Sequence, residues 1–562
     1  MTRRAVPLLL LLVSGLGLLA VVVSSTGGGS PERNVARRFL DAWRQTDYEA
    51  MHALLTPGAQ RTYPLATFQS AYRTAAATAT VRSLDPGEVD DAGAGAVRAP
   101  VVVRTRIFGT LRLTARLTVG RGGPEPRIAW GPELAFPEVR TGDDLTRRTF
   151  LPKRAAILAH DGTPLASGPE RSSPLGPAAS AVTGHIGAVT VERAPALRAL
   201  GHPDDAFVGT SGLELVLEDR LAGAPGGELR IGGRVVARAL ARRAPDVRTT
   251  IVPRVQRAVV EALGGRFGGI IVLRPRTGEI LGLAGVPLSA AQPPGSTFKI
   301  ITAVAALEAG LVKASTAFGI ETSTTLEGVE ISNADHEACG GTFAQAFAHS
   351  CNSVFAPLGA RLGAERLVDA AERFGFNEPP PILGAVPNTI PRADELGDRL
   401  AVGSSAIGQG RVQATALGMA SVAAAIAMRG RRARASILPV ERPRYTRAAT
   451  SRAARSVGRM MVDVVRFGTA AAAAIPGVVV AGKTGTAELV DAPRPAEGVD
   501  ARQPPPEPPD TATDTDAWFV GYAPASRPRV AVGVMLVRAG KGGEVAAPLA
   551  RQVMLAALGK SG

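Results

Sequence analysis

The sequence predicts a multidomain α+β protein with a single N-terminal membrane anchor. The chain has 562 residues, which at roughly 150 residues per domain indicates three to four domains. Apolar residues make up 45% of the chain and charged residues 20%. This composition is globular and argues against a disordered chain and against a multi-span transporter. A helical pattern followed by strand-like alternation before residue 145 favours a small α+β unit at the N-terminal end.

The first 30 residues carry a targeting or anchoring segment. Arg3 and Arg4 precede an uncharged run of nineteen residues, 5–23, which is close to the length that crosses a bilayer. Positive charge before the run places the N-terminus in the cytoplasm and the rest of the chain outside. A cleaved secretory signal is the alternative, because small residues follow at 24–30. We expect a retained anchor and stalk over 1–30, and hence a single-pass protein of the cell membrane whose remaining chain is extracytoplasmic.

Two further units precede the largest one. The first, 31–145, begins with an amphipathic helical pattern over 34–55 and continues with alternation over 97–118, which Gly109 divides into a hairpin. The second, 146–245, is dense in Gly, Pro, Ala and Arg and shows only short strand signals.

The third unit, 246–562, has clearer elements. We expect a helix over 253–263 and a strand pair at 269–273 and 280–284 around a Thr-Gly turn. The apolar stretch 403–427 contains polar interruptions, so it predicts a buried core helix and not a second membrane span.

A serine and a lysine lie three residues apart at the predicted start of a helix. Pro294 and Gly295 break the chain just before Ser296, and an apolar helical run follows Lys299. Residues three apart share one helix face, which brings the amine near the hydroxyl. A desolvated lysine can lose its charge and serve as the base for such a hydroxyl. This pattern alone is weak, because it is expected by chance roughly a few tenths of a time in such a chain.

Two more motifs follow in order. Ser350-Cys351-Asn352 supplies a hydroxyl and a carboxamide after a helical run, and Lys483-Thr484-Gly485-Thr486 follows an apolar strand-like run. The chance of all three motifs in this order is about one in several hundred or less. The set is therefore specific.

On these motifs the chain resembles the penicillin-binding proteins and serine β-lactamases. It is most similar to class B, monofunctional penicillin-binding proteins of the methicillin-resistance type. The stretches that carry this resemblance are 130–137, 142–143, 184–187, 212–214, 221–227, 294–299, 406–410, 483–488 and 516–524. The resemblance implies an NTF2-like α+β cone over 31–145 and an extended, β-rich dimerisation or linker domain over 146–245. For 246–562 it implies a serine β-lactamase-like transpeptidase domain, an antiparallel sheet flanked by helices.

The implied reaction is acyl transfer from a peptidoglycan stem peptide. Ser296 would attack the bond between the last two D-alanines, with Lys299 as its base. Ser350 would relay the proton to the leaving amine, and Asn352 would hold the substrate amide and Lys299. β-Lactams would be trapped as acyl-enzymes.

The third motif implies substrate binding. Lys483 is assigned a catalytic role, and Thr484, Gly485 and Thr486 would bind the substrate, the two threonine hydroxyls holding its terminal carboxylate. The backbone N–H groups of Ser296 and Thr486 would form the oxyanion hole.

Cys339 and Cys351 are the only cysteines. Their spacing and the expected oxidising compartment favour a disulfide, with two free, partly buried thiols as the alternative. No metal site and no cofactor are predicted, because two thiols without histidines at ligand spacing do not make a zinc site.

Composition and resemblance together limit the partners and leave alternatives open. The net charge of +15 suits an anionic surface or wall polymer. Nucleic acid is not expected, because aromatic residues make up only 4% and no nucleic-acid motif is present. No glycan-polymerising domain is visible, so the resemblance implies a partner glycosyltransferase or cell-wall synthesis complex.

Three alternative functions remain open: a D-Ala-D-Ala carboxypeptidase, a β-lactamase and an inactive β-lactam-binding scaffold.

Overall fold

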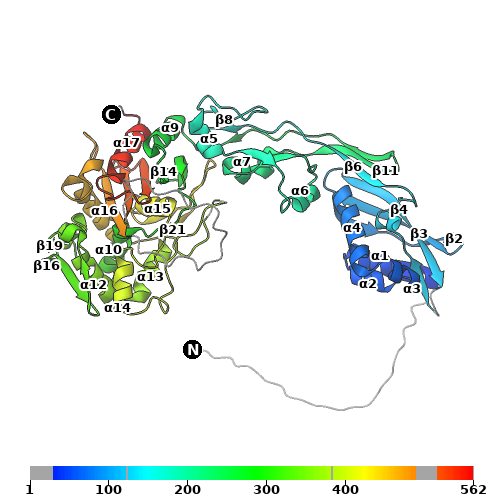
Figure 1. The fold of residues 1–562 in the computed structure, drawn as a ribbon, viewed down its shortest axis with the longest axis horizontal. Coiled ribbons are helices and arrows are strands. Elements are labelled where there is room, and N and C mark those ends of the chain that lie inside the picture. The colour runs from blue at the N-terminus through cyan, green and yellow to red at the C-terminus, as the bar shows by residue number, and fades with distance from the viewer. Residues whose placement is uncertain (1–29, 122–124, 381, 383, 489–514, 561–562) are drawn as a thin grey trace, which may run out of the picture. The chain divides into compact units, whose positions relative to one another are not determined.

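The computed structural model describes residues 30–121, 125–380, 382, 384–488 and 515–560 (Figure 1). The predicted anchor run, 5–23, lies outside the described residues. Within the described ranges, no helix is both long and apolar enough to cross a membrane. The chain divides into two compact units. Of the described residues, the first unit contains those up to Thr149 together with Pro195–Gly201 and Gly227–Ala239; the second contains Phe150–Ala194, His202–Gly226 and those from Leu240 onward.

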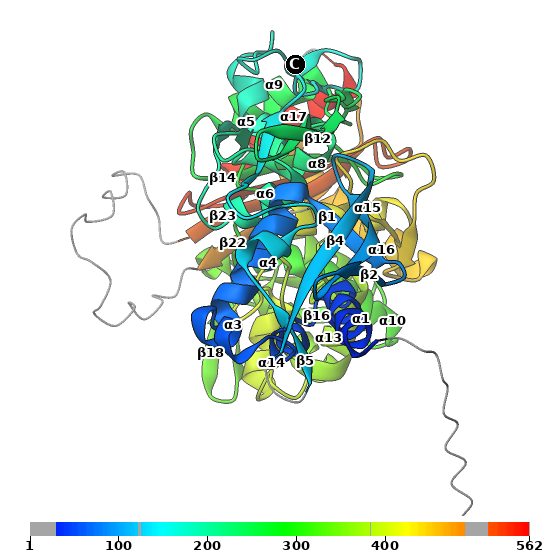
Figure 2. The same cartoon turned by 90° about the vertical axis from the view of Figure 1, so that its right-hand side faces the viewer.

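Helices precede an antiparallel sheet in the first unit, which is drawn in blue and light blue in Figure 2. The sheet order is β1-β3-β4-β5, with β2 paired to β3. The predicted hairpin at 97–118 is confirmed as β3 and β4, which turn at Gly109 with a φ of +69°. The elements are α1 (Pro31–Arg44), α2 (Tyr48–Ala53), α3 (Pro57–Thr62), α4 (Leu65–Ala79), β1 (Val81–Pro86), β2 (Asp90–Gly93), β3 (Ala96–Thr105), β4 (Thr110–Arg121), β5 (Pro126–Ala129), η1 (Pro132–Ala135) and β6 (Leu145–Phe150).

The single helix predicted over 34–55 is wrong in its middle. α1 ends at Arg44, Thr46 has a φ of +56°, and Asp47 caps the start of α2 by accepting a hydrogen bond from Ala50 N. The amphipathic face is nevertheless the predicted one, because Val35, Phe39 and Trp43 are buried. A side chain that caps a new helix has thus overridden a continuous apolar period.

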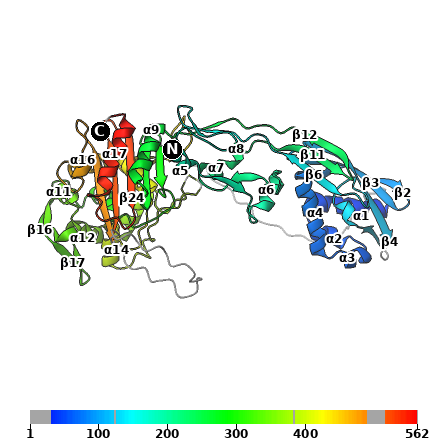
Figure 3. The same cartoon turned by 45° about the horizontal axis from the view of Figure 1, so that its top comes forward.

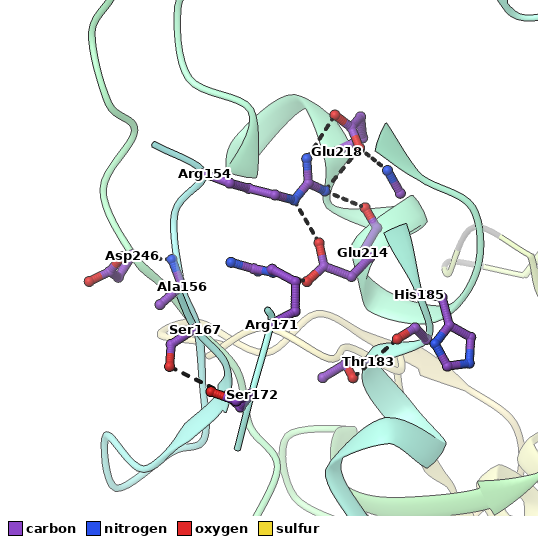
Figure 4. Close-up of polar contacts among 12 residues, drawn as sticks. Arg154, Ala156, Ser167, Arg171, Ser172, Thr183, His185, Glu214, Glu218 and Asp246 are labelled. Atoms are coloured by element: carbon purple, nitrogen blue, oxygen red, sulfur yellow. Dashed lines mark hydrogen bonds and ion pairs between the residues drawn. The ribbon is translucent and has the colours of Figure 1, made fainter. Parts of the chain in front are cut away.

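The linker region is made of short elements and is fixed by buried charges (Figure 4). Arg154 Nε lies 2.7 Å from Glu214 Oε2, and its other two nitrogens lie 3.0 and 2.9 Å from the Glu218 carboxylate. Arg171 Nε donates to the other Glu214 oxygen at 2.7 Å. The elements of this region are β7 (Ile157–Leu158), β8 (Pro164–Ala166), α5 (Pro177–Thr183), β9 (Ile186–Ala188), α6 (Ala194–Leu200), β10 (Phe207–Gly209), α7 (Gly212–Val216), α8 (Glu218–Leu221), β11 (Gly226–Ile231), β12 (Arg234–Ala239) and β13 (Val247–Arg248).

A five-stranded antiparallel sheet of order β15-β14-β24-β23-β22 forms the centre of the second unit. Helices α9 and α17 pack side by side against one face (Figure 3), and α15 packs against the sheet as well. The predicted helix at 253–263 and the predicted strand pair are confirmed as α9, β14 and β15. The sheet and these helices are α9 (Pro253–Leu263), β14 (Gly268–Arg274), β15 (Glu279–Gly285), α15 (Ala416–Ala427), β22 (Ala481–Glu488), β23 (Thr515–Ala523), β24 (Val530–Leu536) and α17 (Ala546–Leu558).

The remaining elements form the helical part and small hairpins of this unit. They are η2 (Gly295–Phe298), α10 (Lys299–Glu308), β16 (Ala317–Glu321), β17 (Ser323–Leu326), β18 (Val329–Ser332), η3 (Ala334–His336), β19 (Cys339–Thr342), α11 (Phe343–Ala348), α12 (Asn352–Leu362), α13 (Ala364–Arg373), α14 (Arg399–Ala406), β20 (Arg431–Ala433), β21 (Tyr445–Arg447), α16 (Ser451–Arg466) and η4 (Ala471–Ala473).

The prediction of one helix over 403–427 is wrong, because two helices occupy this stretch. α14 ends at Ala406, and α15 begins only after Thr415, whose hydroxyl accepts a hydrogen bond from Gly418 N at 3.0 Å. Gly408 and Gly410 between them have φ values of +79° and +69°, which a helix does not allow. The predicted burial of α15 is confirmed.

Candidate active site

Ser296 lies in the 3₁₀ turn η2, directly before α10. The Thr297 hydroxyl donates to Pro294 O at 2.7 Å and closes this turn. Thr297, Phe298 and Lys299 are buried, whereas Ser296 is only partly buried. The predicted helix start is therefore confirmed, and the turn leaves the Ser296 side chain accessible while it buries the lysine three residues later.

Ser350 lies in a strained turn between α11 and α12. Its φ is +65°, a left-handed conformation that residues other than glycine rarely adopt. Two backbone hydrogen bonds hold the turn, from Ser350 N to Phe347 O at 3.2 Å and from Cys351 N to Ala346 O at 2.9 Å. Strained backbone of this kind persists only where the surroundings fix it, and it is concentrated at functional sites.

Two buried lysines meet at the Ser350 hydroxyl. Lys483 Nζ lies 2.8 Å from Ser350 Oγ, and Lys299 Nζ lies 3.3 Å from the same oxygen. Lys299 also donates to Ser350 O and to Asn352 Oδ1, both at 2.6 Å. The structure therefore brings a residue from each of the three motifs to one point, across more than 180 positions of sequence.

The protein environment disfavours the charged form of both Lys299 and Lys483. Both are fully buried, and no carboxylate of the described ranges forms an ion pair with either amine. Their amines instead lie over the rings of Phe355 and Phe347, 5.5 and 5.8 Å from the centroids. Burial lowers the pKa of Lys299 well below its usual range, and the charge of Lys483 lowers it further. Burial lowers the pKa of Lys483 to about 7. A neutral, proton-accepting amine is thus available near neutral pH.

The third motif lies within the edge strand β22. A Cβ added at Gly485 would lie 2.8 Å from Pro294 O. The backbone of Gly485 therefore passes close to the turn that contains Ser296. The Thr484 hydroxyl is buried and lies 2.5 Å from the Thr469 hydroxyl. The Thr486 hydroxyl is less buried and accepts a weak hydrogen bond from Gly542 N at 3.4 Å. The strand therefore forms one wall of the site, opposite the Ser350 turn.

Comparison with known proteins agrees with this geometry. The family model of the penicillin binding protein transpeptidase domain matches residues 268–555, a little over half of the chain, and that of the penicillin-binding protein dimerisation domain matches residues 135–234. The chain belongs to the penicillin-binding protein transpeptidase family. With both domains present it is a class B penicillin-binding protein.

Individual relatives support the same assignment. The peptidoglycan D,D-transpeptidase PbpA of Mycolicibacterium smegmatis is 32% identical over 404 residues, which cover 59% of this chain and 77% of that relative. A solved D,D-transpeptidase domain of a peptidoglycan glycosyltransferase from Eggerthella lenta is 28% identical, with a TM-score of 0.57, and covers 72% of this chain and 98% of its own. Penicillin-binding protein A of Mycobacterium tuberculosis, solved as a ceftriaxone acyl-enzyme complex, is 26% identical, with a TM-score of 0.56 and the same two coverages.

Some contacts in this penicillin-binding protein differ from the expected ones. The Ser296 hydroxyl has no hydrogen-bond partner among the described residues, so the expected contact with the Lys299 amine is not formed. Lys299 binds Ser350 and Asn352 instead. The Asn352 amide also donates to Ser332 O at 2.8 Å, which leaves one of its two hydrogens for a substrate. A Cβ added at Gly295 would lie 2.7 Å from Thr486 O. The backbone of the turn that contains Ser296 therefore lies against Thr486.

Sequence reasoning missed one residue that holds the second motif. Asn333 is buried and donates to Glu321 O and Glu337 O at 2.7 and 2.8 Å, while its Oδ1 accepts from Ser353 N at 2.8 Å. It thereby fixes the start of α12 directly after Asn352. No motif marks this asparagine in the sequence, because its partners are backbone groups that only the fold brings together.

The cysteines flank the same turn. Cys339, at the start of β19, is joined to Cys351 by a disulfide with a Cα–Cα distance of 5.8 Å. It ties the middle residue of the second motif to the neighbouring hairpin. Within the described ranges no group of three or more His, Cys, Asp or Glu side chains is arranged to hold a metal ion.

Proposed function

We propose that this class B penicillin-binding protein is a peptidoglycan D,D-transpeptidase that works through a Ser296 acyl-enzyme. The observation that carries the proposal is the pair of buried lysines that share the Ser350 hydroxyl beside the Ser296 turn. Burial without carboxylate partners favours the neutral form of both amines, and a neutral amine can serve as the general base that acyl transfer through a serine needs.

The first step forms the acyl-enzyme. Neutral Lys299 takes the proton of Ser296 as its Oγ bonds to the carbonyl carbon between the two terminal D-alanines. The developing oxyanion is held by the backbone N–H groups of Ser296 and Thr486. The C–N bond then breaks, and the proton passes through Ser350 to the leaving amine of D-alanine. Lys483 and the Thr486 hydroxyl hold the terminal carboxylate of the donor, whose negative charge favours the protonated form of Lys483 once substrate is bound.

The second step transfers the acyl group to the amine of a neighbouring stem peptide. This amine attacks the ester carbon, its proton goes to Lys299, and the Ser296 hydroxyl is regenerated. A β-lactam follows only the first step, because its leaving amine remains tethered to the acyl group. Penicillin binding is therefore expected from the same residues.

We also propose the finer features that the sequence predicts. The methicillin-resistance type with an NTF2-like first domain is supported by four helices followed by an antiparallel sheet in the first unit. The domain limits 31–145, 146–245 and 246–562 and the retained anchor over 1–30 belong to this proposal, as does an extracytoplasmic, membrane-bound location. A glycosyltransferase or cell-wall synthesis complex would supply the glycan strands, since stem peptides are carried on them.

The test is intact-mass spectrometry of the full chain in detergent during incubation with a penicillin. A long-lived adduct of one penicillin per chain, absent in Ser296→Ala, is expected. The matched control is Ser289→Ala, which removes an exposed hydroxyl seven residues away and should be acylated like the wild type. An adduct that persists in Ser296→Ala would refute the assignment of the nucleophile.

A further inference from the structure

A cavity lies at the opposite edge of the sheet from the third motif. It has a volume of about 460 Å³ and is bounded by the hairpin β20–β21 and by α15. The segment after β20 continues to the edge strand β15, because Ile280 N donates to Ser436 O at 2.8 Å and Ser436 N donates to Gly278 O at 3.0 Å. In the sheet order β15-β14-β24-β23-β22 this edge is four strands away from β22. The cavity is therefore separate from the acyl-transfer site.

The hairpin concentrates positive charge at this cavity. Residues 429–447 contain seven arginines and one glutamate, and Arg432, Arg434 and Arg444 line the cavity. Arg434 and Arg444 face each other across the hairpin, where Arg434 N donates to Arg444 O at 3.3 Å. Like charges directly opposite one another in a strand pair are destabilising. A bound anion would relieve this repulsion.

The charges at the cavity are only partly neutralised by the protein. Glu378 forms an ion pair with Arg432. Within the described ranges, the guanidinium groups of Arg434 and Arg444 have no carboxylate within 4 Å. A Cβ added at Gly375 would lie 2.4 Å from Arg432 Nη1. The glycine therefore leaves room for the Arg432 guanidinium.

One buried donor at the cavity also lacks a partner, and a second donor at its wall makes no hydrogen bond within the described part of the chain. Arg432 Nε is buried without a hydrogen-bond acceptor among the described residues. Asn388 is 9% exposed, and its Oδ1 accepts from both the backbone and the hydroxyl of Thr415. Its amide nitrogen is not fully buried and is left to bind a ligand in the cavity, because only the Oδ1 atom takes part in these hydrogen bonds. Unsatisfied buried donors are rare and need an explanation, and an anionic ligand would supply the missing acceptors.

The rest of the cavity wall is apolar. Phe374, Val386, Pro387 and Leu417 lie beside the three arginines. Small-molecule sites combine an apolar wall with a few convergent polar groups in this way, and 460 Å³ lies within their usual size range. Guanidinium groups match phosphate oxygens with paired hydrogen bonds. We propose that this cavity binds a phosphate ester, with the phosphate on Arg434, Arg444 and Asn388 and the organic part on the apolar wall.

The test is isothermal titration calorimetry on the full chain in a non-ionic detergent with two probes. sn-Glycerol 3-phosphate represents a free solute, and dihexanoyl phosphatidylglycerol below its micellar concentration represents a lipid headgroup. We expect saturable binding of one probe molecule per chain. Arg434→Gln and Arg444→Gln should each weaken it about tenfold or more, as expected for loss of a charge-assisted hydrogen bond. Asn388→Asp keeps the acceptor for Thr415 but adds a negative charge, and should abolish binding.

The matched control is Arg442→Gln, which removes the same charge from the same hairpin but does not line the cavity. Its affinity should equal that of the wild type. Binding of the glycerol ester indicates a soluble ligand, and binding of the lipid probe alone indicates a headgroup. The proposal is overturned if neither probe binds saturably up to about 10 mM, or if Arg442→Gln weakens binding as much as Arg434→Gln. Penicillin acylation of each variant at the wild-type rate checks that it is folded.

Discussion

Replacing Lys483 by methionine should remove a pH dependence of stability from the transpeptidase unit. Burial lowers the pKa of Lys483 from 10.5 to about 7, so between these values the unfolded chain binds more protons than the folded one. The free energy of unfolding therefore rises with pH over this window and falls as pH drops toward 7. Between pH 7 and pH 9 this lysine increases the free energy of unfolding by about 2 kcal/mol. Methionine has a similar length and no charge, so the variant should lose this gain.

The assay is urea unfolding followed by the fluorescence of Trp518 on β23, with Trp43 and Trp130 replaced by phenylalanine in every protein compared. The wild-type stability should increase by about 2 kcal/mol more than that of Lys483→Met between pH 7 and pH 9. Loss of the Lys483 charge also raises the pKa of Lys299, which acts in the same direction. Lys313→Met, at an exposed lysine, is the control and should behave like the wild type. Parallel pH profiles for wild type and Lys483→Met would refute the inference that a buried, largely neutral amine sits at this site.

Three further predictions concern the support of the site and the linker. Cys351→Ser should lower the free energy of unfolding by about 3 kcal/mol, because it opens the loop closed by Cys339; a non-reducing intact mass equal to that of the reduced wild type would contradict the disulfide. Asn333→Ala should cost about 1 to 3 kcal/mol and slow penicillin acylation measured by stopped flow, and an unchanged rate would show that α12 is held by other contacts. Arg154→Gln should cost about 3 to 5 kcal/mol in thermal unfolding, because it leaves the buried Glu218 without its arginine partner and Glu214 with Arg171 alone, and an unchanged midpoint would argue against this network.

Much of the site could be predicted because its chemistry depends on residue types at short, fixed spacings. Ser296 and Lys299 lie three residues apart at a helix start that follows a proline and a glycine. Ser350 and Asn352 lie two residues apart in one turn. What no spacing could show is that Lys483 and Lys299 share the Ser350 hydroxyl, because this contact depends on the sheet edge and the helical part meeting in space.

The fold was predictable where one period dominates and was missed where local capping overrides it. The hairpin at 97–118 alternates cleanly and has a glycine at its turn, so it was predicted correctly. The apolar period over 34–55 predicts one continuous helix because it continues past Asp47, although that residue caps a new helix. The stretch 403–427 likewise predicts one helix, although Thr415 acts as a cap in the middle of the apolar run.

The most direct test of the central claim is turnover of a synthetic stem pentapeptide ending in D-Ala-D-Ala, with and without a labelled D-amino acid as acceptor. Mass spectrometry would separate the exchanged peptide from the hydrolysed one. Release of D-alanine should depend on Ser296, and the labelled acceptor should enter the product in preference to water. Hydrolysis alone, unaffected by the acceptor, would identify a carboxypeptidase, and release of D-alanine by Ser296→Ala would contradict the acyl-serine mechanism itself.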